Sequence, residues 1–106
     1  MPGRELRLTS TARDDLGRLA AYIIATAGMP ATAANYIRRI EARCVHLCDF
    51  PAVGRSRSDI SAGLRVVPFE GVIIAFKATD SLVRVLRIYG QRQDYERKLS
   101  RDSRES

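Results

Sequence analysis

Two stretches with a helical repeat lie next to each other in the first half of the sequence. In each stretch apolar residues recur every three or four positions, which is typical of a helix with one buried face. The first repeat comprises Ala12, Leu16, Leu19, Ala20, Ile23, Ile24 and Ala27, and the second comprises Ala33, Ile37, Ile40, Cys44 and Leu47. Gly28 favours the left-handed conformation that ends many helices, and Pro30 suits the first turn of a new one. Because the link is so short, we expect the two helices to form an antiparallel hairpin.

The segments that flank these repeats predict where the helices begin and end. Residues 4–8 alternate between polar and apolar side chains, which predicts a short edge strand. The polar segment 9–11 can cap the first helix, and Thr11 with Asp14 resembles a capping box. The second helix should end before Pro51, because the residue before a proline avoids the α conformation.

The second half of the chain begins with a long irregular stretch, residues 51–63, and continues with three apolar runs. A loop of this length in a compact domain is commonly functional. Links of two and four residues join the runs, which predicts an antiparallel meander. The expected strands are residues 64–69, 72–77 and 82–89.

The order of these elements predicts an α+β domain of the form β-α-α-β-β-β. We expect the helical hairpin to pack on one face of a small antiparallel sheet. A length of 106 residues suits a single domain, 1–106, whose charged tail 96–106 is either a short helix or flexible.

Both faces of the expected sheet are apolar. In the middle strand Val72, Ile74 and Phe76 oppose Ile73 and Ala75, and in the last strand Leu82, Leu86 and Ile88 oppose Val83 and Val85. Two helices can cover only one face. The tail, a loop or a second copy of the chain could cover the other face, but we favour a partner segment that completes the core.

The charge of the chain indicates a macromolecular partner. Lysine and arginine total 18 against 12 acidic residues, a formal net charge of +6, and Lys77 and Lys98 are the only lysines. Arginine pairs bidentately with carboxylates and phosphates, so an acidic protein, a nucleic acid or both would suit this surface. Solubility alone is the simpler alternative.

Residues for conventional catalysis are few. His46 is the only histidine and falls within a helix, and the adjacent Asp14 and Asp15 suit the dipole of a helix start. Cys44 and Cys48 lack further metal ligands, so we expect them to be reduced and buried in the core. We therefore expect no metal, no cofactor and no enzymatic activity. The chain carries no signal-like or membrane-spanning apolar run, so we expect a cytoplasmic protein that does not enter a membrane.

One cluster of polar residues lies on the first and last meander strands and just beyond them. It comprises Arg65, Arg87, Tyr89, Arg92, Asp94 and Tyr95. If these strands lie close together, the cluster could stabilise the charge of a cleaved phosphodiester without a histidine. The same residues equally suit a contact patch for a nucleic acid or an acidic protein.

An ordered set of segments resembles the RelE/ParE superfamily of bacterial toxins from toxin–antitoxin pairs, and the ParE branch most closely. The first segments are Ala12-Arg13-Asp14-Asp15-Leu16, Tyr22-Ile23, Ala34-x-x-Tyr36-Ile37 and Cys44-x-x-Leu47. The later ones are Phe50-Pro51-x-x-Gly54-Arg55-x-Arg57-x-Asp59-Ile60, Gly63-Leu64-Arg65 and Val85-Leu86-Arg87-Ile88. The resemblance spans about residues 4–95. It departs from the ParE pattern at residues 89–94, where Tyr89 replaces a common histidine and Gln93 separates Arg92 from Asp94.

The resemblance to ParE-type toxins implies the toxin of a type II toxin–antitoxin system. Such a toxin inhibits DNA gyrase, a type II topoisomerase, and so blocks replication. A ParD-like antitoxin with an acidic, amphipathic segment would neutralise it in a hetero-oligomer, which would contact DNA only through the antitoxin. The implied target-binding residues are Arg84, Arg87, Tyr89, Arg92, Asp94 and Tyr95, and the implied antitoxin-binding residues are Arg38, Arg39, Arg55, Arg57, Ile74, Phe76 and Leu86.

The resemblance leaves two alternatives. RelE-type relatives are ribosome-dependent mRNA endonucleases, and Arg65, Arg92 and Tyr95 would be their catalytic residues here. The lysines that RelE-type toxins place before the meander are absent, which argues against this activity. The second alternative is a non-toxic binding module that assists repression of its own operon.

Overall fold

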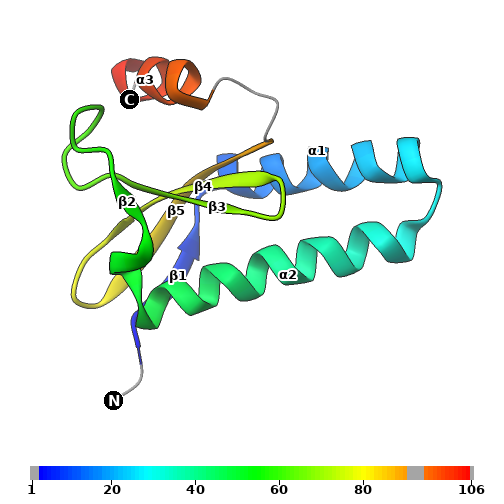
Figure 1. Ribbon diagram of the computed structural model, residues 1–106, viewed down its shortest axis with the longest axis horizontal. Coiled ribbons are helices and arrows are strands. Elements are labelled where there is room, and N and C mark those ends of the chain that lie inside the picture. The colour runs from blue at the N-terminus through cyan, green and yellow to red at the C-terminus, as the bar shows by residue number, and fades with distance from the viewer. Residues whose placement is uncertain (1–2, 91–94, 106) are drawn as a thin grey trace.

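The computed structural model describes residues 3–90 and 95–105, which form three α-helices and a five-stranded sheet (Figure 1). The helices are α1 (Ser10–Ala27), α2 (Pro30–Asp49) and α3 (Tyr95–Glu105), and a 3-10 turn, η1 (Pro51–Val53), follows α2. The strands are β1 (Glu5–Leu8), β2 (Arg55–Ser56), β3 (Arg65–Phe69), β4 (Val72–Ala78) and β5 (Leu82–Gly90). The predicted helical hairpin and three-stranded meander are confirmed. No helix within these ranges is long and apolar enough to cross a membrane.

The sheet has the strand order β1-β5-β4-β3-β2 and is mixed. The meander strands pair antiparallel, as expected, and β1 lies at an edge, but it pairs parallel with β5. The expectation of a purely antiparallel sheet is therefore wrong at this one pairing. The stretch 51–63 also contains a short strand, β2, which pairs with the start of β3.

The ends of α1 follow from single residues. Thr9 is the N-cap, and its hydroxyl accepts a hydrogen bond from the amide of Ala12 at 3.0 Å. Because Thr9 is the cap, Thr11 lies inside the first turn, and the expected capping box with Asp14 does not form. At the other end Gly28 adopts the left-handed conformation with φ of 67°, which a residue with a side chain rarely adopts.

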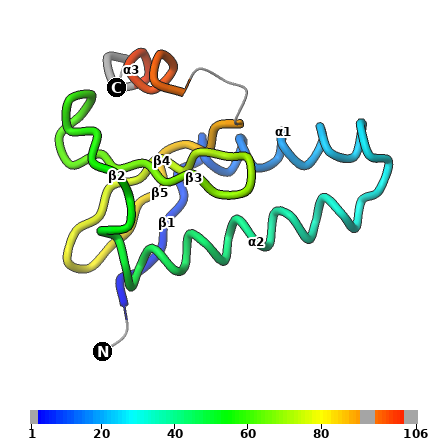
Figure 2. Tube along the Cα trace, viewed as in Figure 1, coloured from blue at the N-terminus to red at the C-terminus, as the bar shows by residue number. Residues whose placement is uncertain are grey.

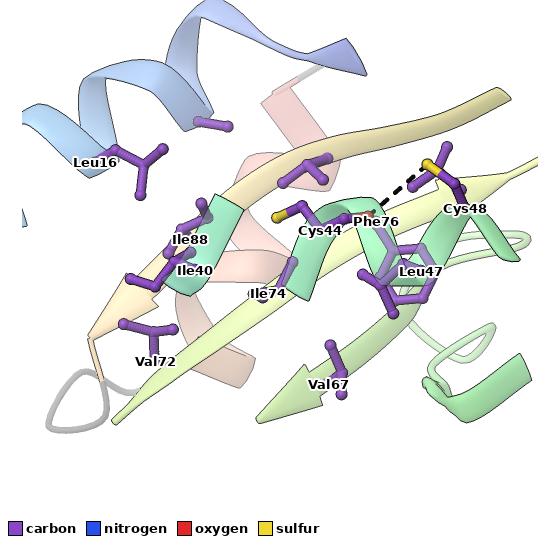
Figure 3. Packing of buried hydrophobic residues seen from close by; sticks show 13 residues of the cluster. Leu16, Ile40, Cys44, Leu47, Cys48, Val67, Val72, Ile74, Phe76 and Ile88 are labelled. Atoms are coloured by element: carbon purple, nitrogen blue, oxygen red, sulfur yellow. Dashed lines mark hydrogen bonds between the residues drawn. The ribbon is translucent and has the colours of Figure 1, made fainter. Parts of the chain in front are cut away.

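The larger core lies between the hairpin and the sheet (Figure 3). It comprises Ala12, Leu16, Ile40, Cys44, Leu47, Cys48, Val67, Val72, Ile74, Phe76, Val83, Val85 and Ile88. Both cysteines are free and buried, as expected, and burial raises the pKa of the Cys44 thiol to about 12. We call this set of residues the hairpin-side core.

A β-bulge in β5 decides which residues join this core. Ala75 pairs with Arg87, whereas the next residue, Phe76, pairs with Val85, so Leu86 is an extra residue in β5. The bulge shifts the alternation by one position, which puts Ile88 on the same face as Val83 and Val85. The prediction that Leu82, Leu86 and Ile88 share a face is therefore wrong, because it assumed an unbroken period of two.

A smaller apolar layer covers the opposite face of the sheet. Its buried members are Leu64, Val66, Ala75, Tyr89 and Leu99, with Ile60, Ile73, Leu86 and Tyr95 packed against them. Leu99 and Tyr95 belong to α3, so the tail forms a helix that lies across this face, on the side opposite the hairpin (Figure 2). The favoured expectation of a partner segment here is wrong for the residues that α3 and the loop at Ile60 already cover. We call this set the α3-side layer.

Candidate functional site

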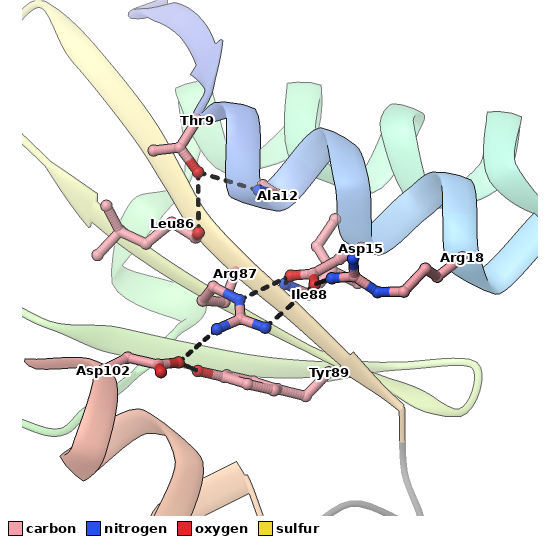
Figure 4. Close-up of polar contacts among 9 residues, drawn as sticks. All are labelled: Thr9, Ala12, Asp15, Arg18, Leu86, Arg87, Ile88, Tyr89 and Asp102. Atoms are coloured by element: carbon pink, nitrogen blue, oxygen red, sulfur yellow. Dashed lines mark hydrogen bonds and ion pairs between the residues drawn. The ribbon is translucent and has the colours of Figure 1, made fainter.

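A polar network joins α1, the bulged part of β5 and α3 around the side chain of Arg87 (Figure 4). Arg87 donates to both carboxylate oxygens of Asp15, at 2.9 Å from Nε and 3.1 Å from Nη2. Its Nη1 donates to Oδ2 of Asp102 at 2.5 Å, and the hydroxyl of Tyr89 donates to the same oxygen at 2.6 Å. The guanidinium of Arg87 also lies 4.8 Å from the centre of the Tyr89 ring. Three elements far apart in the sequence are thus joined through one cation.

Asp15 is buried because of its place on α1. Ala12 and Leu16 face the sheet from the same turn of the helix, so the side chain between them points at β5 as well. There Oδ2 of Asp15 accepts a hydrogen bond from the backbone amide of Ile88 at 2.9 Å, and Arg18 donates to Oδ1 at 2.7 Å. We expected Asp15 only to complement the helix dipole, and that expectation did not include these contacts. Its neighbour Asp14, for which the same role was expected, is exposed.

The bulge at Leu86 supplies the backbone groups that the network uses. The hydroxyl of Thr9 donates to the carbonyl of Leu86 at 2.9 Å, just beside the amide of Ile88 that Asp15 binds. The N-cap of α1 and a residue of its second turn are therefore both hydrogen-bonded to the irregular part of β5. The bulge and the start of α1 hold each other in place.

The network raises the pKa of two of its members, Arg87 and Tyr89. The hydrogen bonds from Arg87 to Asp15 raise the pKa of the guanidinium, which keeps it charged. Burial, together with the hydrogen bond to Asp102, raises the pKa of the Tyr89 phenol. Tyr89 is therefore a hydrogen-bond donor at neutral pH rather than a base. In this arrangement each charge is matched, which suits a clamp between elements better than proton transfer.

The proposed target-binding residues do not converge on one exposed surface. Tyr89 is fully buried, Arg87 is held by two carboxylates, and Tyr95 packs in the α3-side layer. The expectation that Arg87 and Tyr89 are exposed is therefore wrong, because α3 covers them. Arg84 is exposed, while Arg92 and Asp94 lie outside the described residues.

The structure does not bring Arg65 and Tyr95, two of the three candidate nuclease residues, to one side of the sheet. Arg65 pairs with Phe76, a member of the hairpin-side core, so its side chain lies on the hairpin side of the sheet. Nη1 of Arg65 donates to the carbonyl of Gly54 at 2.7 Å. Tyr95 lies on the opposite side, in the α3-side layer. The third residue, Arg92, is outside the described residues.

The proposed antitoxin-binding residues separate into exposed and buried groups. Arg38, Arg39 and Arg55 are exposed, and Arg39 pairs with Glu70 at 3.0 Å. Ile74 and Phe76 are fully buried in the hairpin-side core, so their predicted exposure is wrong.

Arg57 is also buried, which contradicts its expected place on the surface. It pairs with Asp59 at 2.9 Å and with Glu96 of α3 at 3.4 Å. The hydrogen bonds that Arg57 donates to Asp59 raise the pKa of Arg57 and lower that of Asp59. Leu86, the last residue of the set, is partly buried in the α3-side layer.

An open cavity of about 660 Å³ adjoins the network at the start of α1. Its lining combines cations, hydroxyls and leucines, and comprises Thr9, Ser10, Thr11, Ser61, Leu64, Lys77, Arg84, Leu86, Arg87, Leu99 and Asp102. Lys77, Asp102 and the hydroxyl residues were not among the candidate site residues, because they come from separate elements that only the fold brings together. Among the described residues, no three histidine, cysteine or acidic side chains come together to hold a metal ion.

The chain matches the model of one protein family, described as the ParE toxin of the type II toxin–antitoxin system parDE, over residues 6–95. It is similar in structure to a chain from the chromosomal ParDE toxin–antitoxin system of P. aeruginosa, with 21% identity, a TM-score of 0.71 and coverage of 85% of this chain and 98% of that one. It is also similar to a chain of the RelBE toxin–antitoxin complex from Mycobacterium tuberculosis, with 23% identity, a TM-score of 0.55 and coverage of 85% and 99%. At identities this low, the similarity shows that the chain shares the fold of these two proteins. No curated protein matches the chain in sequence.

Proposed function

The chain belongs to the ParE toxin family of type II toxin–antitoxin systems, and from this premise we propose that it inhibits DNA gyrase and is neutralised by a ParD-like antitoxin. Inhibition would act by protein–protein contact in the cytosol and would block replication. The complex with the antitoxin is proposed as the form in which the toxin is held inactive.

The observation that carries this proposal is the family match, which extends from the second residue of β1 to the first residue of α3. It includes every strand and both helices of the hairpin, so it is not confined to one motif. The similarity to chains from two toxin–antitoxin systems supports an antitoxin as the partner. The opposite placement of Arg65 and Tyr95 favours a binding function over the RelE-like endonuclease.

A supercoiling assay with purified gyrase, relaxed plasmid and the full chain tests the proposal. We expect loss of supercoiling at micromolar toxin, and recovery when the antitoxin is added first. Full supercoiling at this concentration would contradict gyrase as the target. A parallel translation reaction with ribosomes distinguishes the alternative, because cleavage of the mRNA there would indicate a RelE-like endonuclease.

A further inference from the structure

Three cations lie side by side across three neighbouring strands. Arg7 of β1 pairs in register with Arg84 of β5, and Arg84 pairs with Lys77 of β4. Residues that pair directly point to the same side of a sheet. The neighbours of these cations along each strand, such as Leu8, Val83 and Phe76, pack in the hairpin-side core. The three cations therefore lie on the other face, and we call them the cation row.

The cation row lowers the stability of the unbound protein, because like charges placed directly opposite on adjacent strands repel. The described residues offset this repulsion only in part. Arg7 pairs with Glu5 at 3.1 Å where both side chains are exposed, and Lys77 donates to the hydroxyl of Ser61 at 2.9 Å. The side chain of Arg84 forms no hydrogen bond or ion pair with residues 3–90 or 95–102. A local arrangement that opposes folding is typical of a functional site.

The cation row borders a continuous groove. The cavity of about 660 Å³ is lined by Lys77 and Arg84, and a second cavity of about 500 Å³ is lined by Arg7 and Arg84. Thr9 and Arg84 contribute to both, so the two cavities meet there; we call them together the Arg84 groove. Leu64, Leu86 and Leu99 supply an apolar wall within the first cavity. The groove thus offers positive charge and aliphatic surface next to each other.

We propose that the Arg84 groove binds a peptide segment of a partner protein in which carboxylate side chains alternate with aliphatic ones. A carboxylate accepts two parallel hydrogen bonds from the guanidinium of Arg84, and a second carboxylate is within reach of Lys77 on the adjacent strand. Between them an aliphatic side chain contacts the leucine wall. Among the described residues that line the first cavity, Asp102 carries the one carboxylate, and it is bound by Arg87 rather than by Lys77 or Arg84.

The lining favours a peptide over a nucleic acid. Among the described residues that line the two cavities there is no aromatic side chain on which a base could stack. The three leucines also have no counterpart in a sugar–phosphate backbone. Taking the partner to be the antitoxin rests on the proposed function, whereas the chemistry of the groove does not. A segment bound here covers Arg84, the exposed member of the proposed target-binding residues.

Binding of labelled probes to the full chain tests this assignment. The first probe is a fluorescein-labelled twelve-residue peptide of alternating Glu and Leu, and its matched partner has Gln at every Glu. We expect the Glu/Leu peptide to bind and the Gln/Leu peptide to bind roughly tenfold more weakly or worse. Arg84→Glu and Lys77→Glu should each raise the Kd of the Glu/Leu peptide by roughly tenfold, because each replaces an attraction by a repulsion.

Arg13→Glu is the matched control, since it changes the net charge equally at an exposed position on α1 that lines neither cavity. We expect it to leave the Kd unchanged, and circular dichroism melts confirm that each variant folds. If Arg13→Glu weakens binding as much as Arg84→Glu, the attraction is general rather than local and the proposal fails. Tighter binding of a single-stranded oligonucleotide, lost in Arg84→Glu, would assign the groove to nucleic acid instead. Neither result depends on the supercoiling assay, so failure of the gyrase proposal is recognised separately.

Discussion

The two faces of the sheet are held by different kinds of interaction. The hairpin-side core is apolar and joins two long helices to four strands, and its largest residues are fully buried. The α3-side layer has few buried apolar residues and depends on ion pairs of Asp102 and Glu96 with Arg87 and Arg57. Apolar burial is non-directional and insensitive to pH, whereas charge-assisted hydrogen bonds are directional and respond to pH and salt. One face therefore determines the fold, and the other fastens a helix that can be released separately.

Truncating a buried leucine to alanine on each face of the sheet should reveal the largest contrast in the free energy of unfolding. Leu47→Ala, in the hairpin-side core, should lower the free energy of unfolding by about 4 kcal/mol through lost burial and a cavity. Leu99→Ala removes an equally buried leucine from α3, yet its cost cannot exceed the free energy that docks α3. Chemical denaturation gives the global values, and hydrogen exchange should show faster exchange in α3 of Leu99→Ala. Equal losses of global stability would mean that the two faces unfold as one unit.

Asp15 links the two regions, and its removal should be the next most damaging change. Asp15→Ala leaves Arg87 with one carboxylate and the Ile88 amide without its acceptor, which should cost about 3 kcal/mol by thermal or urea unfolding. Asp14→Ala is the matched control, because Asp14 is adjacent and exposed, and it should change stability by less than about 0.5 kcal/mol. A comparable loss in both variants would assign the effect to the helix dipole.

Asp102 acts only on the α3 side, so its loss should be smaller and more local. Asp102→Asn weakens the bonds from Arg87 and Tyr89 and should cost about 1.5 kcal/mol. Limited proteolysis should cut this variant in residues 95–105 sooner than the parent chain, while the melting of the hairpin and sheet changes little. An unchanged rate of cleavage would show that the apolar contacts of Leu99 alone hold α3.

The smallest expected effect concerns alkaline pH. The pKa of Tyr89 is higher in the folded than in the unfolded state, so its contribution to stability is complete below about pH 10 and is lost as pH rises above that value. Tyr89→Phe should cost about 1 kcal/mol at pH 7 and should remove an alkaline slope of up to about 1.4 kcal/mol per pH unit. Unfolding curves from pH 9 to 11 measure this slope, and identical slopes in both proteins would show that Tyr89 does not titrate in the unfolding transition.

Local rules predicted the hairpin and the meander because the determining residues act within a few positions. Gly28 and Pro30 fix the link between the helices, and Glu70-Gly71 forms the expected tight turn with positive φ at both residues. The parallel pairing of β1 was not predicted, since it depends on where β5 lies after the whole hairpin has formed.

The contents of the site were less predictable than the fold, and the bulge at Leu86 is the main reason. It depends on Thr9 and Asp15, which lie more than 70 positions away in the sequence, so no periodicity within β5 reveals it. The docking of α3 was equally hidden, because a charged helix with one buried leucine resembles a flexible tail in composition. The bulge places Ile88 in the hairpin-side core, and the docking of α3 covers Arg87 and Tyr89.

The parallel pairing of β1 with β5 has a consequence for how the chain is made. Glu5 pairs with Leu82, so 77 further residues must be added after Glu5 before β5, the strand that pairs with β1, exists. At a typical rate of about 5–20 residues per second, this delay is roughly 4 to 15 s. The hairpin can form early from local contacts, but the sheet closes, and the cation row assembles across it, only after β5 has been synthesised. During that interval the nascent chain has its helical hairpin but neither Arg84 nor α3, so the groove is unfinished.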